Sequence, residues 1–279
     1  MYLPNAGDRE VTGNPVWDLF CGVELYPTAG PYISLKALIV CRFGLFFWQL
    51  IVLVAAKASY ELSGNGQLHW PVAAITLIQT VYLAKNFYWE DGYMQSFDIT
   101  FEHLGFYTGW GCMVILPTLY PFTSLYFVEH CPLTAFDNLT SVLSVTLGLG
   151  LVAATYWADY QRQVVRATDG ETLIWGQKPT LIRAKYTDQS GAERRSVLLA
   201  SGFWAIGRHF NYTTEILIYL AIGLPALATS LLPYLTFLFV VVVLSHRATR
   251  DDRKCALKYG KYWEEYCSLV PALLVPRIF

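Results

Sequence analysis

The sequence predicts an all-α, polytopic membrane protein: a bundle of about six spans with a polar, basic layer on one side. Hydrophobic residues make up 54% of the 279 residues and charged residues only 15%, whereas soluble chains carry about 25% charged residues. Nine Trp, nineteen Tyr and sixteen Phe add the aromatic content that is typical of membrane interfaces. The formal net charge of −1 gives no indication of nucleic-acid binding.

The expected spans follow from apolar stretches near the ~20 residues that a helix needs to cross a hydrocarbon core. One segment is broken by glycines and contains Pro117, so we expect it to cross as a kinked or interrupted helix. The last apolar block is long enough for a hairpin of two short spans that breaks near Gly223–Pro225. The predicted stretches are 33–56, 69–89, 97–120, 139–158 and 213–245.

The positions of Lys and Arg predict the orientation of the chain. Segment 159–211 holds eight of the twenty, and the segment from residue 246 holds seven more. One hairpin separates these segments, so they should share a side, and the positive-inside rule makes that side the cytosol. We therefore expect a multi-pass protein of the endoplasmic reticulum membrane with 159–211 and 246–279 cytosolic. The six cysteines show no paired spacing, so neither a disulfide framework nor a metal site is expected.

A series of motifs follows in order along almost the whole chain. These are T-G-N at 12–14, G-V-E-L-Y-P at 22–27, D-I-T-F-E-H-L-G-F-Y-T-G-W-G at 98–111, T-D-G at 168–170, L-I-W-G at 173–176, L-A-S-G-F-W-A-I-G-R-H-F-N-Y at 199–212, R-D-D-R-K-C-A-L-K-Y-G-K-Y-W-E-E-Y at 250–266 and V-P at 270–271. Together they resemble the sterol reductase family, which saturates ring and side-chain double bonds with NADPH. L-P-T-L-Y at 116–120 and the preceding G-F-Y-T-G-W-G-C run look most like the Δ7-sterol (7-dehydrocholesterol) reductase branch.

The resemblance implies a ten-span fold, of which this chain looks like the C-terminal portion without the leading spans. That would make it a short natural form or an incomplete gene model. A single domain over 1–279 is implied, with spans and a sterol pocket in 1–158 and an NADPH-binding portion in 159–279. The family often has Arg-Pro where this chain has Arg42 and Phe43, and His where it has Phe101. After Val270-Pro271 it often has Tyr-Arg where this chain has Ala272 and Leu273. These differences affect the sterol contacts more than the cofactor site.

The implied activity is NADPH-dependent reduction of the Δ7 double bond of 5,7-diene sterols in sterol biosynthesis. The partners would be the sterol and membrane lipid, with a membrane protein partner as a further option for the missing spans. Two alternatives stay open. One is a Δ14-sterol reductase of the same family, and the other is a catalytically inactive sterol-binding scaffold or fragment. A transporter is the weakest alternative, because no inverted repeat is visible.

The residues themselves indicate how NADPH would be held. Arg162 and Arg166 are four apart near the cytosolic end of a predicted helix, so they share one face. Two forked guanidinium groups suit the 2′-phosphate that distinguishes NADPH from NADH; the alternative is a pair of positive-inside anchors. Trp204, Asn211 and Tyr212 offer a stacking plane, a carboxamide and a hydroxyl, unless the two aromatics are interface residues.

The tail should contribute one face of an amphipathic helix. Asp251, Cys255, Lys258 and Tyr259 have the spacing of such a face, and Tyr266 is expected to extend it. The aspartate would accept ribose or amide hydrogen bonds and Lys258 would meet phosphate; a solvated charged helix is the alternative. The family positions implied as cofactor contacts are Arg162, Arg166, Leu199, Trp204, Asn211, Tyr212, Asp251, Cys255, Ala256, Leu257, Lys258, Tyr259 and Tyr266.

Reduction of a carbon–carbon double bond also needs a proton donor. A buried carboxyl group can be kept neutral for this task, because burial raises its pKa. Ionisable residues near a membrane face are functional candidates, and the 98–120 segment is rich in them, although each alone is more often structural. The candidate acids form a group from which no single residue is selected: Asp98, Glu102, His103, Tyr107 and Tyr120.

Overall fold

The computed structural model describes residues 14, 16, 28–29, 33–34, 38–64, 66–89, 109–130, 137–187, 191–227 and 229–276. The chain forms two compact units, each built from separate stretches of sequence. The first comprises Met1–Val145 and Ile222–Thr236, and the second comprises Thr146–Ala221 and Phe237–Phe279. The functional division predicted at residue 158 stays a prediction.

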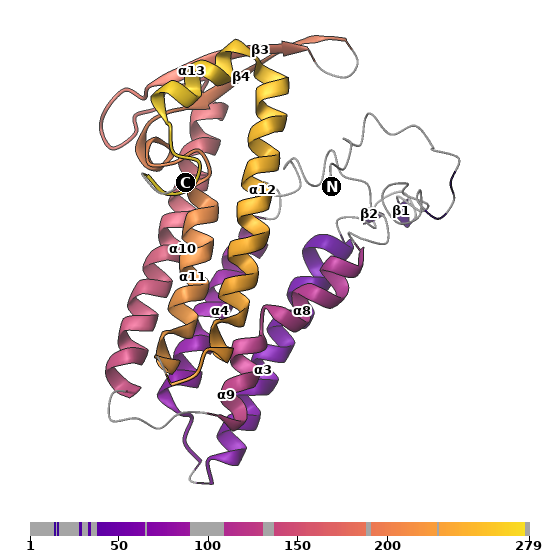
Figure 1. Ribbon diagram of the computed structural model, residues 1–279, viewed down its shortest axis with the longest axis vertical. Coiled ribbons are helices and arrows are strands. Elements are labelled where there is room, and N and C mark those ends of the chain that lie inside the picture. Colours follow the sequence, from indigo (N-terminus) through magenta and orange to yellow (C-terminus); the bar gives the residue numbers. More distant parts are fainter. Residues whose placement is uncertain are drawn as a thin grey trace. The chain divides into compact units, whose positions relative to one another are not determined.

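Helices dominate the described residues (Figure 1), which confirms the predicted helical membrane bundle. In the described part of the chain, four helices are long and apolar enough to cross a membrane: Gly44–Leu62, Gly111–Glu129, Asn138–Ala167 and Leu232–Tyr259. Two more helices coincide with predicted crossings. They are α4 (Trp70–Tyr88) and the fourteen-residue α11 (Phe210–Gly223), which is shorter than a full span.

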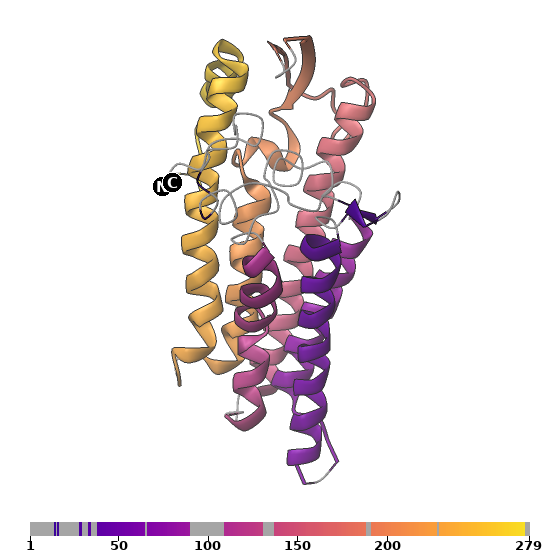
Figure 2. The same cartoon turned by 90° about the vertical axis from the view of Figure 1, so that its right-hand side faces the viewer.

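A polar chain of side chains joins the helices of the first unit. Trp48 of α3 (Gly44–Leu62) donates from Nε1 to Gln79 Oε1 of α4 at 2.7 Å. Gln79 in turn donates from Nε2 to Ser124 Oγ at 3.0 Å, and Ser124 belongs to α9 (Phe122–Glu129). All three side chains are buried, so the amide is satisfied away from water and fixes how the three helices pack. Figure 2 shows α3 and the magenta α9 side by side.

The segment predicted at 97–120 is interrupted, as expected, but its break and its end lie elsewhere. Pro117 lies in the first turn of the short α8 (Leu116–Leu119), where a missing N–H is tolerated. The break comes at Pro121, after which α9 carries the helix on to Glu129. A π-helical turn, η3 (Gly111–Ile115), precedes α8. Residues 97–108 of this prediction lie outside the described residues.

The second unit combines long helices with a small sheet that the sequence analysis did not predict. Helix α10 (Asp137–Ala167) continues nine residues beyond the predicted 139–158 stretch. Strands β3 (Leu181–Thr187) and β4 (Glu193–Leu199) then pair antiparallel. Alternate side chains of β3 are buried, and Figure 1 shows α13 (Lys261–Leu269) lying along the hairpin. Their shared core contains Ile182, Ala184, Leu198, Tyr259, Trp263, Tyr266 and Val270.

The predicted hairpin of 213–245 is present. Helix α11 ends at Gly223, a 3₁₀ turn containing Pro225 follows, and Leu227 adopts a positive φ of 48°. Helix α12 (Leu235–Tyr259) then runs past 245 without interruption.

The expectation that Tyr266 extends the helical face of Tyr259 is wrong. Gly260 has a φ of 52°, a conformation that glycine adopts without steric cost, and it ends α12. A separate helix, α13, carries Tyr266 back to the same core through the chain reversal. The two tyrosines are therefore neighbours across a turn and not along one helix.

Candidate active site

The C-terminal end of α10 holds an arginine stacked on a tryptophan. The guanidinium carbon of Arg162 lies 4.5 Å from the ring centre of Trp204, and Arg162 also approaches Asp159 at 3.4 Å. Trp204 is itself fixed, because its Nε1 donates to the carbonyl oxygen of Ala158 at 2.7 Å. A cation over an indole face is stabilised electrostatically. The stack therefore places one predicted cofactor residue on another.

A tight turn brings Trp204 into this position. Trp204 lies in a 3₁₀ turn, η4 (Gly202–Ala205), that begins at a glycine with a φ of 63°. A Cβ atom on Gly202 would lie 2.4 Å from Gln161 Oε1. That oxygen accepts a hydrogen bond from the backbone N–H of Phe203 at 3.1 Å. Only glycine fits both the backbone conformation and the close approach of α10.

Two other residues predicted as cofactor contacts pair with each other and join α11 to α12. The Tyr212 hydroxyl donates to Asp251 Oδ2 at 2.8 Å. Two cations also surround this carboxylate, with Arg247 Nε at 3.8 Å and Arg250 Nη2 at 3.4 Å. Arg247 in addition lies over the Tyr212 ring at 5.5 Å. Asp251 is thus held at a defined place within a positive surrounding.

The reversal at Gly260 gathers further predicted residues around Arg166. Arg166 lies within electrostatic range of Arg162, Cys255, Tyr259 and Tyr266. Tyr266 is buried, and this burial raises the pKa of its phenol well above the ordinary value, so it stays a neutral donor. We name the group the basic–aromatic cluster. Its members are Arg162, Arg166, Trp204, Tyr212, Asp251, Cys255, Tyr259 and Tyr266.

The remaining predicted cofactor residues lie around this cluster in different ways. Lys258 Nζ lies over the rings of Tyr186 and Tyr259, at 4.2 and 5.2 Å. Leu199 is buried in a core cluster that also contains Trp204, and Asn211 is half-buried in the first turn of α11. Ala256 and Leu257 point outward, and Leu257 is 75% exposed.

Arg208 and His209 were not among the predicted cofactor residues, although both lie inside the motif at 199–212. Arg208 donates to Asp252 and to the carbonyl groups of Val270 and Pro271. His209 stacks on Tyr212 with 5.2 Å between ring centres, and its buried Nε2 has no hydrogen-bond partner among the described groups. Burial lowers the pKa of His209 to about 4 against the opposing pull of nearby carboxylates. The adjacent aspartates of the R-D-D sequence at 250–252 were the feature that could have indicated Arg208, because a second carboxylate needs a second cationic partner.

The predicted proton donors are mostly not described. Asp98, Glu102, His103 and Tyr107 lie outside the described residues. Tyr120 is half-buried in the first unit, and its ring centre lies 5.0 Å from that of Trp48. It therefore stands beside the polar chain of Trp48, Gln79 and Ser124.

Comparison with known proteins decides which family carries this arrangement. The model of the "Ergosterol biosynthesis ERG4/ERG24 family" matches residues 5–279. The chain belongs to this sterol reductase family. A curated 7-dehydrocholesterol reductase of Arabidopsis thaliana is 37% identical over 276 residues, covering 99% of this chain and 63% of the relative.

Two further relatives belong to different branches of the family. The 7-dehydrocholesterol reductase of Xenopus laevis is 36% identical, covering 99% of this chain and 57% of the relative. A Delta(14)-sterol reductase of Methylotuvimicrobium alcaliphilum is 33% identical, covering 96% of this chain and 60% of the relative. The chain thus spans 57–63% of the length of these relatives. Family and helices together make it a multi-pass membrane protein.

Proposed function

We propose that this protein is an NADPH-dependent reductase of the Δ7 double bond in 5,7-diene sterols, acting in sterol biosynthesis at the endoplasmic reticulum membrane. The observation that carries the proposal is the 37% identity over 276 residues to a 7-dehydrocholesterol reductase. The second candidate is Δ14 reduction, which the 33% identical Delta(14)-sterol reductase favours.

The basic–aromatic cluster fits an anionic dinucleotide. Arg166 is exposed and Arg162 keeps 39% of its side chain accessible, so both offer donors to a phosphate group. The buried, unpaired Nε2 of His209 nearby is a polar atom that a ligand would satisfy. We assign Arg162 and Arg166 to the 2′-phosphate and Asp251 to a ribose hydroxyl or amide. When bound, NADPH supplies a hydride at this site.

The protein's own residues position these contacts before the ligand arrives. Trp204 holds the Arg162 guanidinium by stacking, and Tyr212 holds the Asp251 carboxylate by a hydrogen bond. Side chains fixed in this way lose less conformational entropy on binding. His209 would stay neutral at physiological pH because its pKa is near 4, so it adds a hydrogen-bonding group without adding charge.

The proton must come from a group on the protein or from water. A conjugated 5,7-diene favours such a step, because protonation gives a delocalised allylic cation. The donor belongs in our proposal to the 98–120 segment, with Asp98, Glu102, His103, Tyr107 and Tyr120 as the candidates. Tyr120 is the one among them whose surroundings are described, and its aromatic contact with Trp48 restricts the ring.

Expression in a host that accumulates ergosterol-type 5,7-dienes tests the function. Active protein should convert the dienes to Δ5 sterols and remove the diene absorbance, with mass analysis of the sterols as the readout. Variant Arg162→Ala/Arg166→Ala is the matched control and should convert the dienes more slowly than the unmodified protein at equal expression. If the dienes persist while a host blocked at Δ14 reduction is relieved, the Δ14 candidate replaces the Δ7 one. No change in either host, with protein present in the membrane, supports the inactive scaffold.

A further inference from the structure

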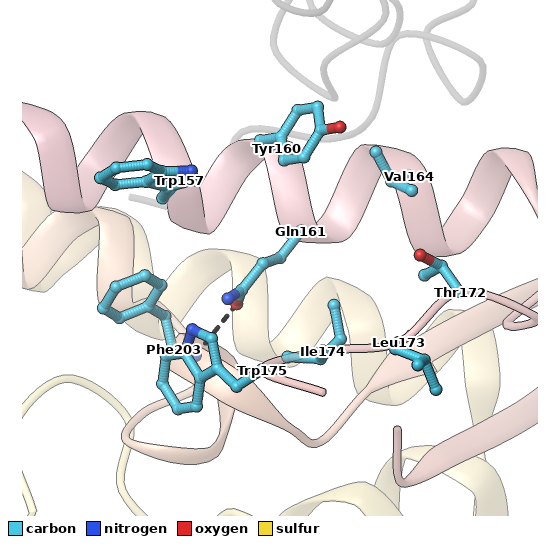
Figure 3. A pocket seen from close by; sticks show the side chains of 9 residues that line it. All are labelled: Trp157, Tyr160, Gln161, Val164, Thr172, Leu173, Ile174, Trp175 and Phe203. Atoms are coloured by element: carbon cyan, nitrogen blue, oxygen red, sulfur yellow. Dashed lines mark hydrogen bonds between the residues drawn. The ribbon is translucent and has the colours of Figure 1, made fainter. Parts of the chain in front are cut away.

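An open groove runs along the end of α10 on the surface of the second unit (Figure 3). Its volume is about 480 Å³, and it lies between α10 and the loop 172–175. The side chains that line it include Trp157, Tyr160, Gln161, Leu173, Trp175 and Phe203. Gln161 and Phe203 close one wall through the hydrogen bond between the Gln161 amide oxygen and the Phe203 backbone.

The groove is rimmed by large apolar side chains that remain accessible. Trp157 is 57% exposed, Leu173 63% and Trp175 65%, and Tyr160 is 47% exposed. Four such side chains therefore line one groove with apolar surface that is available to an apolar partner.

The loop is built to hold two of these side chains outward. Ile174 is buried in the core of the unit, and its backbone exchanges hydrogen bonds with Gln177 at 2.9 and 3.0 Å. Trp175 follows with a φ of 49°, which is an uncommon conformation for a bulky residue. Its ring packs edge-on against Phe203, with 5.2 Å between centres. The strained backbone of Trp175 and its contact with Phe203 thus hold the tryptophan ring at a defined place on the surface.

The groove continues an exposed face of α10, a candidate membrane span. Within the second unit, exposed positions recur along α10 at helical spacing, through Leu147, Gly150, Ala153, Trp157 and Tyr160. The same helix is a candidate span. Arg162 and Arg166 follow directly, and aromatic residues next to basic ones are typical of the boundary between hydrocarbon and cytosol. These exposed positions therefore lead along α10 into the groove without an intervening charge.

We propose that this groove binds one phospholipid of the cytosolic leaflet. An acyl chain lies along Trp157 and Tyr160, while Leu173 and Trp175 insert at the level of the headgroups. The hydroxyl of Tyr160 and that of Thr172, which also lines the groove, are polar groups suited to the glycerol and phosphate region. The site is separate from the basic–aromatic cluster and does not depend on the proposed reaction.

Photocrosslinking in the full chain tests this site. The photoreactive residue p-benzoylphenylalanine replaces Leu173, or Glu193 as a matched exposed position on the β3–β4 hairpin. Both variants are reconstituted in phosphatidylcholine nanodiscs that contain an alkyne-tagged phosphatidylcholine. We expect about tenfold more tagged lipid on position 173, as one buried large side chain contributes enough free energy for such a ratio. Equal labelling at both positions, or a protein or sterol adduct at 173, would overturn the proposal.

Native mass spectrometry gives a second readout that does not need a photoreactive residue. Leu173→Asp should lose one retained phospholipid, since a charge at the rim opposes insertion. Leu269→Asp is the control, because Leu269 is also exposed, at 48%, but lies at the end of α13 away from the groove's lining residues. Thermal melting of both variants reports on folding. Retention of the phospholipid by a folded Leu173→Asp protein contradicts the site.

Discussion

The Arg208 guanidinium lies 2.8 Å from Asp252 and joins α12 to the segment that follows α13. Its Nε donates to the carboxylate, while Nη1 donates to the carbonyl oxygens of Val270 and Pro271 at 2.9 and 2.8 Å. Only 10% of the Arg208 side chain is exposed. One side chain thus ties three separate parts of the second unit together.

Replacing Arg208 by lysine should destabilise the protein although the charge is kept. A single ammonium group cannot reproduce the forked geometry, and buried charge pairs cost about 3–5 kcal/mol when broken. We expect a clearly lower melting temperature in detergent. Arg183→Lys is the control, because Arg183 and Asp169 form an exposed pair, which contributes about 0–1 kcal/mol. Equal melting of the two variants would show that Arg208 carries no special role.

Removal of the arginine pair should affect NADPH much more than the sterol. For Arg162→Ala/Arg166→Ala we expect the KM for NADPH to rise at least about tenfold, because hydrogen bonds to charged groups contribute about 1.5–3 kcal/mol each. The KM for the sterol should change little. Lys185→Ala is the control, as Lys185 is an exposed cation on β3 paired with Glu193. Equal use of NADH by the unmodified enzyme would exclude the 2′-phosphate assignment.

Because His209 is buried, the protein should lose stability on acidification. Its pKa falls from 6.5 to about 4 in the folded protein, mainly through burial. Below pH 6.5 the unfolded chain takes up a proton that the folded chain refuses, so stability decreases from pH 6.5 down to about 4 and is unaffected above 6.5. The slope is at most about 1.4 kcal/mol per pH unit. His209→Gln should therefore lose less melting temperature between pH 7 and pH 5 than the unmodified protein; identical losses would refute this.

Gly202 should tolerate no side chain. Gly202→Ala places a methyl group 2.4 Å from Gln161 Oε1 and 2.8 Å from Ile174 Cγ2 at a φ of 63°. Gly191→Ala is a matched control, since Gly191 has a φ of 80° but open space around it. Both variants carry backbone strain of about 1 kcal/mol, and only Gly202→Ala adds the clash that displaces Trp204. A melting temperature that falls further for Gly202→Ala, with weaker NADPH binding, is the expected result.

Tags test the predicted orientation directly. An epitope near residue 190 and another after Phe279 should both react with antibody once only the plasma membrane is permeabilised, because fifteen of the twenty Lys and Arg lie in 159–211 and 246–279. Protection of either tag would overturn the predicted cytosolic placement of these segments and of the proposed cofactor site.

Much of the helical framework was readable from the sequence, because apolar length and Pro–Gly breaks act locally. The turn at Gly223–Pro225 is an example. Other features depend on contacts that sequence spacing does not reveal. Gly260 ends α12 through a positive φ. Tyr266 lies seven residues after Tyr259, which is also the spacing of one face of a continuous helix, so the spacing gave no indication of the break.

In the candidate site, too, some features could be predicted from the local sequence and others depend on contacts between distant residues. Arg162 and Arg166 were predicted from helical spacing together with the family resemblance. The stack of Arg162 on Trp204 joins residues forty-two positions apart and follows from the close approach at Gly202. The role of Arg208 depends on carbonyl groups of the later segment 270–271, and a backbone acceptor leaves no signature in residue type.

The backbone of residues 272–274 bonds to Arg208, His209 and Thr213, which has a consequence for biosynthesis. The ribosome makes residues 208–213 well before residues 272–274, so the start of α11 lacks these backbone hydrogen bonds until the later segment has been translated. During that interval Arg208 has neither Asp252 nor the carbonyl oxygens to satisfy it. The proposed cofactor site can therefore assemble only after residues 270–274 have been synthesised, and a chain arrested before residue 270 should leave this end of the second unit unfolded.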